Sequence, residues 1–388
     1  MRPYDFAQKM KKFDITIFAA SYQHFSGENL IEDGALFKED CAFSVPFVFV
    51  NTVESNSSGW KRCFNMVEFY LKMFRVGKIY AKKNGRPDLI IASSPHPLTM
   101  LAGIKIAKKW GIPCICEIRD LWPEAIFAGS EKLTHGSALG KALVWGERWM
   151  YKNADALVFT KEGDTDYIKE QGWDKKGVSL EKCFYINNGV DTAKFEECNS
   201  SKQSDAFRVV YAGTIRPVND IDTILDAAKL LIDKENIQFM IYGDGNQVDR
   251  LRKRIVDEKI TNIVLKGFVP KEKIPSILGS AAVNILNYSS EKYNWSRGSS
   301  SNKLFEYMAS GKPIISTVKT GYSIINRYEC GIELESCTPI DLARAITQIH
   351  DMPPESYLKM GENGKYGAKN FDLETLSAKY EQLIEKYV

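Results

Sequence analysis

The segment from Ser299 to Pro313 combines a hydroxyl-rich turn, a short predicted helix and one carboxylate in its second turn. Gly311 and Pro313 mark the end of that helix. A helix start offers backbone N–H groups and a positive dipole end that suit a diphosphate, and a carboxylate can accept bonds from a ribose. The predicted binding residues are Ser299, Ser300, Ser301, Asn302, Lys303, Leu304 and Glu306. An ordinary capped helix is the alternative and the commoner case.

Two further loops in the same half follow apolar runs of strand type. The first, after Tyr211, contains Gly213, Thr214 and Arg216, and the fork of an arginine matches phosphate oxygens. A surface arginine in a connecting loop is an equally good explanation. The second is the turn that contains Gly243 and Gly245, which by itself is a common turn signal.

The first half of the chain has charged residues directly after two apolar runs. Arg119 and Asp120 follow one of them, and His96 follows the other. Asp120 could orient or deprotonate an acceptor hydroxyl, and Arg119 could hold an anionic group. The alternatives are an ion pair that closes the strand end, and, for His96, a simple turn residue.

Several classes of protein are poorly supported. No Gly-x-Gly-x-x-Gly follows a first strand, and there is no Walker loop or nucleophile elbow. The eight cysteines include no Cys-x-x-Cys, and the four histidines are isolated, so we predict no metal site and no disulfide framework. We also expect no bound cofactor and no nucleic-acid partner.

The elements that must position these residues alternate between β-rich runs and helical periodicity, which predicts an α/β fold with parallel sheets. Ile224, Leu225, Ala228, Leu231 and Ile232, for example, form an apolar stripe of helical spacing. The predicted strands are Asp14–Ala19, Val45–Val50, Asp88–Ser93, Pro113–Ile118, Ala154–Thr160, Cys183–Ile186, Arg208–Ala212, Ile237–Tyr242, Ile263–Leu265, Ala282–Leu286, Pro313–Thr317 and Gly331–Leu334.

A chain of 388 residues suits two domains. The polar stretch 196–205 has no periodicity and is the best linker. We therefore predict an N-terminal domain over 1–195, a C-terminal domain over 206–370 and a final helical segment over 371–388. Ligands of such sheets bind beyond the carboxyl ends of the strands, so we expect a cleft between the domains to hold the site.

The stretch Trp60–Arg86 is rich in both basic and aromatic residues, with Glu68 as its single acid. A basic helix with an apolar stripe can lie on an anionic membrane surface. A helix packed on the core, with its other face in solvent, is an equal alternative. No apolar run approaches the length of a membrane span, and the first residues are polar. We therefore expect a cytoplasmic protein, which the basic helix could place at the inner membrane face.

In combination, these motifs resemble the GT-B glycosyltransferases of family 4, in particular bacterial enzymes of O-antigen and capsule synthesis. The similar stretches run in family order and are Arg119-Asp-Leu-Trp-Pro, Asn187-Asn-Gly-Val-Asp, Phe195, Tyr211-Ala-Gly-Thr-Ile-Arg, Tyr242-Gly-Asp-Gly, Lys266-Gly-Phe-Val and Asn302-Lys-Leu-Phe-Glu-Tyr-Met-Ala-Ser-Gly-Lys-Pro.

The resemblance implies two Rossmann-like, doubly wound domains, retention of anomeric configuration and no obligatory metal. It implies a donor nucleotide in the C-terminal domain and an acceptor in the N-terminal one, with the final helix crossing back onto the latter. Glu306 matches the ribose-binding glutamate, and the amides of 301–303 match those that hold the diphosphate. Lys266, Gly267, Phe268 and Val269 match the segment on the nucleobase, and Asp120 falls near the catalytic pocket.

The chain departs from the family pattern at three places. Gly298 stands where the family has the acid that contacts the sugar, and Thr214 and Asn219 stand at the positions of its two phosphate-binding cations, so we assign that role to Arg216. Residues 1–7 match the family's first helix, without the central strand that precedes it. The absence of that strand predicts exposed sheet edges.

The resemblance therefore implies transfer of a sugar from a nucleotide diphosphate sugar, with UDP as the expected nucleotide, to a lipid-linked saccharide. Two alternatives remain open at this point. One is an epimerase that acts on a UDP-sugar without an acceptor. The other is a catalytically silent partner in a polysaccharide assembly complex, which Gly298 and the absent strand favour.

Overall fold

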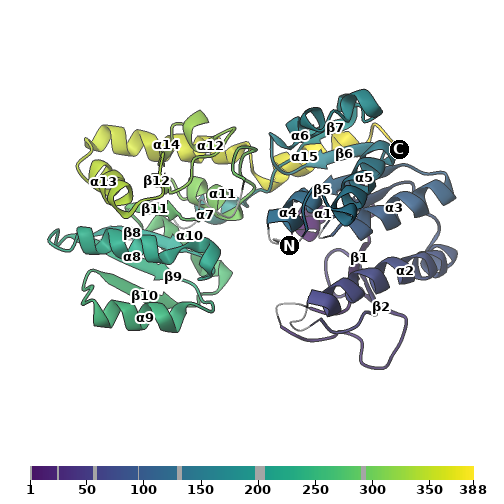
Figure 1. The fold of residues 1–388 in the computed structure, drawn as a ribbon, viewed down its shortest axis with the longest axis horizontal. Helices are drawn as coiled ribbons and strands as arrows, with labels where there is room; N and C mark the ends of the chain where they lie inside the picture. Colours follow the sequence, from purple (N-terminus) through teal and green to yellow (C-terminus); the bar gives the residue numbers. More distant parts are fainter. Residues whose placement is uncertain are drawn as a thin grey trace. The chain divides into compact units, whose positions relative to one another are not determined.

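The computed structural model describes residues 2–23, 26–55, 59–94, 96–128, 133–196, 206–289 and 294–388. It divides into unit 1, Met1–Asn187 with Leu376–Val388, and unit 2, Asn188–Thr375 (Figure 1). This division falls before the predicted boundary at 195, because Val190 packs in the core of unit 2 and its amide donates to the carbonyl of Phe371 at 3.0 Å. Apart from Glu196, the predicted linker lies outside the described residues.

Unit 2 contains one six-stranded parallel sheet with the strand order β10-β9-β8-β11-β12-β13. All six strands lie where apolar runs predict them. Their bounds are β8 Phe207–Ala212, β9 Ile237–Tyr242, β10 Ile263–Gly267, β11 Val283–Leu286, β12 Ile314–Ser316 and β13 Gly331–Glu333. The order reverses between β8 and β11, and in open α/β sheets the ligand binds beyond the carboxyl ends of the strands at this switch point.

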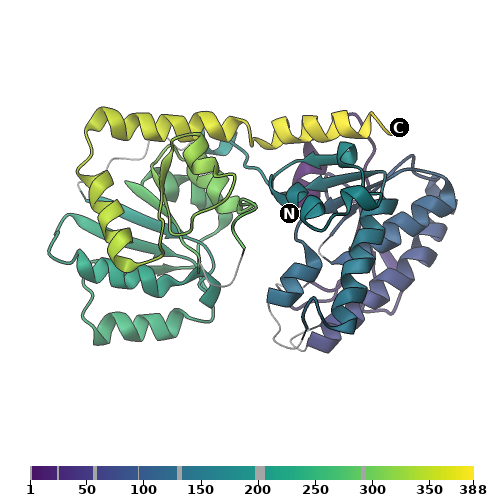
Figure 2. The ribbon, with the colours of Figure 1, turned by 45° about the horizontal axis from the view of Figure 1, so that its top comes forward.

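Helices cover both faces of this sheet (Figure 1, Figure 2). One face carries α8 (Ile221–Leu230), α9 (Val248–Asp257) and α13 (Pro339–His350). The other carries α7 (Ala193–Glu196), α10 (Ile274–Gly279), α11 (Asn302–Ala309), α12 (Ile324–Arg327) and α14 (Pro354–Lys369), with α14 packed along α11. Short 3-10 turns occur at Pro217–Asn219 and Lys271–Lys273. The unit is doubly wound, as predicted.

Unit 1 has two sheets rather than the single sheet of a doubly wound domain. One has the order β1-β3-β2, with β1 (Ile17–Ala20) parallel to β3 (Phe47–Val50) and β2 (Phe37–Asp40) antiparallel to β3. The other is parallel and has the order β4-β5-β6-β7. Its strands are β4 Ile90–Ser93, β5 Cys114–Ile118, β6 Ala156–Phe159 and β7 Cys183–Tyr185.

The separation into two sheets leaves β1 and β4 as end strands of the sheets that the structure describes. β3 and β5 are fully buried, whereas every residue of β1 is half-buried and Ile91 of β4 is 39% exposed. The sequence prediction missed β2, because the charged residues of its Phe-Lys-Glu-Asp sequence suit a sheet edge rather than a core.

The helices of unit 1 pack on these two sheets. α2 (Gly59–Asn84) covers one face of the three-stranded sheet, and α1 (Arg2–Lys9) lies against the other. The core around β4 to β7 includes α3 (Pro97–Trp110), α5 (Ala138–Asn153) and α6 (Asp164–Glu170), and α4 (Trp122–Ala128) packs on α5. Short 3-10 turns occur at Asp174–Lys176 and Leu180–Lys182.

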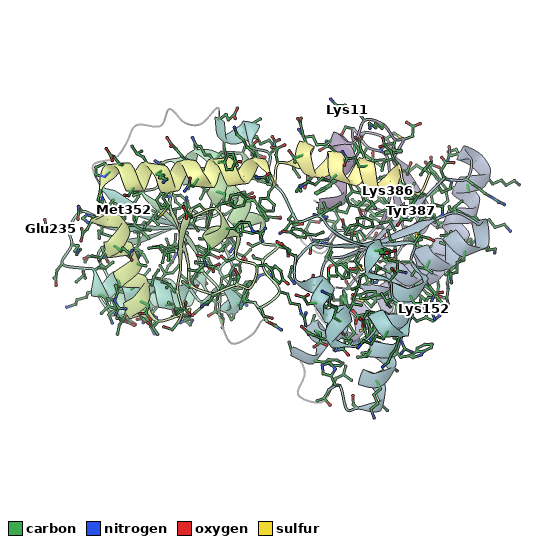
Figure 3. The ribbon with its side chains drawn as sticks, turned by 90° about the horizontal axis from the view of Figure 1, so that it is seen from above. Lys11, Lys152, Glu235, Met352, Lys386 and Tyr387 are labelled. Carbon is green, nitrogen blue, oxygen red and sulfur yellow. The ribbon has the colours of Figure 1, made fainter. Side chains whose placement is uncertain are left out.

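The final helix α15 (Leu373–Ile384) runs from the end of unit 2 into unit 1. Within unit 1, Tyr380 packs edge-on against Phe6, with 6.0 Å between ring centroids. The backbone amide of Lys11 donates to Glu381 at 2.8 Å, and Tyr387 donates to the carbonyl of Asp155 at 3.2 Å. Figure 3 labels Lys11, Lys386 and Tyr387 in this region.

Candidate functional site

The predicted binding residues of unit 2 gather at its switch point. The loop 213–220 follows β8, and the described part of the loop after β11 leads into α11. These loops contact each other, because the side-chain amide of Asn287 donates to the backbone carbonyls of Asn219 and Asp220 at 2.6 and 2.7 Å. The strand-end loops and the start of α11 therefore form one site.

The start of α11 is open to a ligand. Its N-cap, Ser301, has extended backbone dihedrals but makes no side-chain cap bond, and its hydroxyl instead lies 2.7 Å from the hydroxyl of Tyr288. Among the described residues, no acceptor for the backbone amides of Asn302 and Lys303 is recorded. The backbone carbonyl of Ser300 accepts a hydrogen bond from the side-chain amide of Asn188 at 2.6 Å, which fixes the residue before the helix start. Unpaired amides at a helix start suit an anion such as a diphosphate.

Lys303 points from this helix start into the loop after β8. Its ammonium nitrogen lies 4.7 Å from the ring centre of Tyr211 and 4.8 Å from that of Tyr288, so both rings can stabilise its charge. It also donates to the hydroxyl of Tyr211 at 3.0 Å. Burial lowers the pKa of Lys303 to about 8, against the opposing effect of Glu306.

The loop after β8 provides room for this lysine. A Cβ atom on Gly213 would lie 2.7 Å from the ammonium nitrogen of Lys303. With its amide oriented to satisfy its neighbours, Asn219 accepts a bond from Lys303 at 3.2 Å and donates to the carbonyl of Thr214 at 2.8 Å. Lys303 therefore reaches the part of the loop, around Thr214 and Asn219, at which the family has cations. Arg216 is exposed nearby on the same loop.

Glu306 lies one turn further along α11 and is half-buried. Among the described residues, no hydrogen-bond donor to its carboxylate is recorded. Burial raises the pKa of Glu306, and the charges of Lys271 and Lys303 oppose that rise. A half-buried carboxylate with free acceptor capacity is suited to a pair of ribose hydroxyls.

The remaining predicted residues of unit 2 fall into two groups. Gly243 and Gly245 allow close packing of loops, because a Cβ on Gly243 would lie 1.8 Å from the carbonyl oxygen of Gly213 and one on Gly245 would lie 2.1 Å from that of Ile215. In the turn after Lys266, Gly267 has a φ of 77° and presents Phe268, which is 75% exposed. An exposed ring can stack on a nucleobase.

The backbone conformation at position 298 favours glycine. Gly298 has a φ of 97°, a conformation that an acidic residue would adopt only with strain. An acidic residue at this position would therefore require a different local backbone.

The predicted residues of unit 1 lie at the ends of β4 and β5. Asp120 is largely exposed and lies 3.7 Å from the ammonium nitrogen of Lys161. No ion pair between Arg119 and Asp120 is recorded in the described part of the chain, and the partner of Asp120 is Lys161 after β6. The backbone carbonyl of Arg119 accepts a hydrogen bond from the hydroxyl of Thr160 at 3.1 Å, which fixes the main chain at this residue. Both side chains can contact a ligand.

His96 is buried at the start of α3 and packs edge-on against Phe69, with 6.2 Å between ring centroids. Burial lowers the pKa of His96 to about 4, with a smaller contribution from the charge of Arg62. The imidazole is therefore neutral at physiological pH. In this state His96 can act as a hydrogen-bonding group or a weak base.

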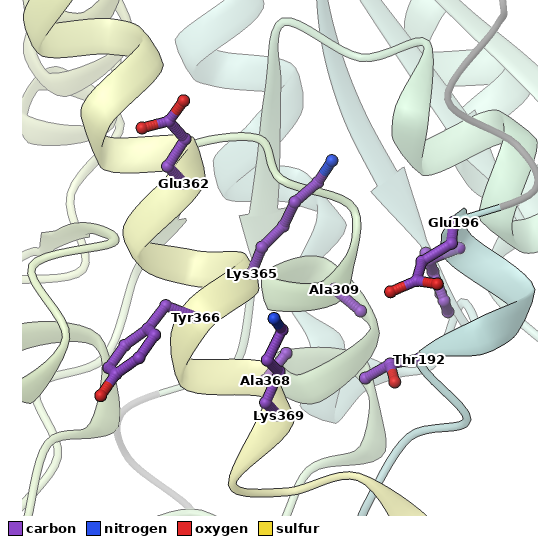
Figure 4. Close-up of a pocket in the computed structure, with 9 residues that line it drawn as sticks. Thr192, Glu196, Ala309, Glu362, Lys365, Tyr366, Ala368 and Lys369 are labelled. Atoms are coloured by element: carbon purple, nitrogen blue, oxygen red, sulfur yellow. The ribbon is translucent and has the colours of Figure 1, made fainter.

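A separate cavity of about 340 Å³ lies at the far end of α11, among α7, α11 and α14 (Figure 4). Thr192, Ala309, Lys365 and Lys369 are among the residues that line it. It includes none of the predicted site residues. The described residues also contain no group of three or more His, Cys, Asp and Glu side chains arranged to hold a metal ion.

Two family models match the chain in consecutive segments. The model of the glycosyl transferase 4-like domain matches residues 40–180, and that of the glycosyl transferases group 1 matches residues 194–366. The chain belongs to the GT-B glycosyltransferases of the family 4-like type. The resemblance predicted from the sequence motifs is thereby confirmed.

Individual similarities are more distant. The chain is 23% identical, over 64% of its length, to the putative teichuronic acid biosynthesis glycosyltransferase TuaH of Bacillus subtilis, and the match spans 62% of that relative. The solved structure of sucrose-phosphate synthase from Thermosynechococcus elongatus superposes with a TM-score of 0.72 at 15% identity, covering 99% of this chain and 92% of the other. Anabaena Alr3699/HepE in complex with UDP gives a TM-score of 0.64 at 14% identity, covering 88% and 86%. These two structures confirm the predicted fold.

Several residues that complete the site were not predicted from the sequence. Tyr288, Asn219 and Asn287 were not among the predicted site residues, and Tyr211 entered only as part of a motif. A sequence signal existed for one of them, since Asn287 follows a predicted strand directly.

Proposed function

We propose that this chain is a retaining glycosyltransferase that moves a sugar from a UDP-sugar to a lipid-linked saccharide in surface polysaccharide synthesis. The observation that carries the proposal is the position of Lys303 and the open start of α11 at the switch point of unit 2. The similar Anabaena protein was solved in complex with UDP, and the Bacillus relative is named for teichuronic acid biosynthesis. Both support the class of donor and of product.

In this proposal, the diphosphate binds at the backbone amides of Asn302 and Lys303, and Glu306 accepts bonds from the ribose. Phe268 stacks on the nucleobase. When the bond between the sugar and the diphosphate breaks, negative charge grows on the leaving oxygen. Lys303, Arg216 and the α11 dipole stabilise that charge from fixed positions, which is the most effective form of electrostatic catalysis.

The acceptor side of the proposal rests on unit 1. Asp120, Arg119 and His96 lie after the ends of β4 and β5, where a ligand of that sheet would bind. Asp120 would orient the acceptor hydroxyl, and Arg119 would hold an anionic group of the acceptor, such as a lipid-linked phosphate. The proton of the acceptor hydroxyl would pass to the Asp120 carboxylate as the bond from the acceptor oxygen to the sugar forms and the bond from the sugar to the diphosphate breaks.

Calorimetric titration with UDP tests the donor site. We expect Glu306→Ala to weaken UDP binding by about tenfold or more, because a carboxylate loses its bonds to ribose. Glu235→Ala removes an exposed acid elsewhere in unit 2 and should leave the affinity unchanged. Equal affinities of wild type and Glu306→Ala would remove Glu306 from the site. Release of UDP from a panel of UDP-sugars would then identify the donor.

A catalytically silent nucleotide-sugar-binding protein is the second candidate, favoured by the glycine at position 298. The two functions differ in turnover: a transferase releases UDP faster when acceptor extract is added, whereas a binding protein does not. Conversion of the sugar without acceptor would instead indicate an epimerase.

A further inference from the structure

Helix α2 carries apolar residues on two opposite faces. One face is buried, where Phe69 and Val76 pack against Val48 and Val50 of the sheet. The opposite face is exposed, and four large apolar residues follow one another along it at spacings of four, three and four positions. Their exposed fractions are 68% for Trp60, 53% for Phe64, 42% for Val67 and 61% for Leu71.

This spacing places the four side chains in one line along the helix. Packing of α2 on the core explains the first face but not the second. A monomeric protein rarely keeps a contiguous row of large apolar side chains in solvent without a partner for it.

The same line continues toward the end of α2 with three cations, Arg75, Lys78 and Lys82, none of them buried. In the described part of the chain, none of the three has a recorded ion pair. Their neighbours differ, since Lys72 pairs with Glu68 at 2.7 Å and Lys83 pairs with Glu39 at 2.9 Å. The outer face of α2, defined as these four apolar residues and three cations, therefore has an apolar half and an uncompensated positive half.

We propose that the outer face of α2 binds the surface of an anionic lipid bilayer. The apolar half would enter the boundary between headgroups and acyl chains, and the cations would lie at anionic headgroups. At about 1.5 Å per residue, the line from Trp60 to Lys82 is about 33 Å long, enough to contact several lipids while lying parallel to the surface. No helix in the described residues is long and apolar enough to cross a membrane.

The charge pattern favours lipid over protein as the occupant. Among the described residues, no ion pair to the three cations of the outer face is recorded, and a fluid anionic surface can neutralise such a row of charges without shape complementarity. The proposal goes beyond the proposed function, because it uses none of the residues assigned to donor or acceptor. It would nevertheless bring a transferase to a lipid-linked acceptor.

Flotation with phosphatidylcholine vesicles, with and without phosphatidylglycerol, tests the proposal on the full chain. We expect binding only to the anionic vesicles, and weaker binding in high salt. Phe64→Ser with Leu71→Ser should reduce binding by about tenfold or more, because both remove apolar area that the bilayer would bury. The triple variant Arg75→Glu, Lys78→Glu and Lys82→Glu should do the same by charge reversal.

Matched controls change the same chemistry elsewhere on the surface. Val256→Ser with Leu358→Ser removes two exposed apolar side chains, whose exposed fractions are 74% and 60%. Lys175→Glu, Lys176→Glu and Lys253→Glu reverse three exposed charges. We expect both controls to bind anionic vesicles as the wild type does, and all variants to unfold at the wild-type temperature.

The proposal would be overturned if the wild type did not bind anionic vesicles, or if the matched controls lost binding to the same extent. It would also be overturned if the protein formed an oligomer in the absence of vesicles and the double variant Phe64→Ser with Leu71→Ser dissociated that oligomer. The last outcome would make the outer face a contact between copies of the chain. UDP titration of the same variants separates this result from the donor site, because none of the substitutions lies in unit 2 loops 213–220 or 294–306.

Discussion

The ammonium nitrogen of Lys303 lies 3.0 Å from the phenolic oxygen of Tyr211 and faces the rings of both Tyr211 and Tyr288. The lysine comes from the start of α11, and Tyr211 comes from β8. Through this contact, the helix that would bind a diphosphate supplies a cation to the loop after β8, which has Thr214 and Asn219 where related chains have cations. Lys303 thus brings a cation from α11 to the loop after β8.

We expect Lys303→Met to lower kcat by about a hundredfold or more, because a preorganised charge on the leaving group is lost. Methionine has a similar length and avoids an unpaired buried polar group, so the protein should remain folded. Transfer assays with UDP release measure the effect. Lys253→Met, on the surface of α9, is the matched control. A kcat of Lys303→Met within a factor of about three of wild type would exclude this role.

The pH profile offers an independent test of the same lysine. In the folded protein the pKa of Lys303 is about 8, below its ordinary value of 10.5, so the cation is lost as the pH rises through about 8. We expect kcat/KM to fall over this range in wild type. The fall should move to higher pH in Lys303→Arg, because arginine stays charged. An unchanged profile in this variant would assign the fall to another group.

The titration of Lys303 should change stability with pH in the opposite direction to activity. Between about pH 8 and 10.5, the unfolded chain retains the Lys303 proton and the folded protein has released it. The unfolded state then binds more protons, so this group makes the folded protein more stable as the pH rises. As the pH rises through this range, activity should therefore fall while stability does not. A loss of activity caused by the lost cation can thus be distinguished from one caused by unfolding.

Substitution of Gly243 and of Gly146 by alanine should change the free energy of unfolding in opposite directions. Gly243→Ala should lower the free energy of unfolding by about 2 kcal/mol or more, because its Cβ would lie 1.8 Å from the Gly213 carbonyl oxygen and its φ is 138°. Gly146→Ala, inside α5 with open space around its Cβ, should raise it by up to about 1 kcal/mol. Urea unfolding measures both. A stable Gly243→Ala variant would show that the loops can separate.

Much of unit 2 could be predicted from the sequence because short stretches of residues determine its strands and helices. All six strands follow apolar runs bounded by turn residues, and of the predicted helical stripe only Ile232, which lies beyond the end of α8, is exposed. The start of α11 was also predictable, since its cap and stop signals lie close together in the segment from Ser299 to Pro313.

The missing parts of the prediction depend on contacts between distant residues. Lys303 and Tyr211 are 92 positions apart, and nothing in either local sequence indicates that they meet. The neutral state of His96 depends on burial and on Arg62, which lies in another helix. The two sheets of unit 1 likewise depend on which strands pair, and the alternation of strands and helices does not determine the pairing.

The last prediction concerns a buried carboxyl group between α5 and α6. Glu147 of α5 accepts hydrogen bonds from the hydroxyls of Tyr151 at 2.8 Å and Tyr167 at 2.9 Å. Burial nevertheless raises its pKa to about 7, with smaller contributions from Glu124 and Asp164. The folded protein therefore holds a proton on Glu147 at mildly acidic pH, whereas the unfolded chain, with a pKa of 4.5, does not.

Between pH 4.5 and about 7 the folded state thus binds more protons, and this group makes the protein less stable as the pH rises. Glu147→Gln imitates the protonated form and should remove that slope. Relative to wild type, the variant should gain stability from pH 5 to pH 8, by up to about 3 kcal/mol if the whole shift is expressed. Urea unfolding at both pH values measures the difference. Glu170→Gln, an exposed acid at the end of α6, should show no such gain. An equal slope in Glu147→Gln and wild type would mean that Glu147 stays ionised in the folded protein, with the two tyrosine hydroxyls compensating for its burial.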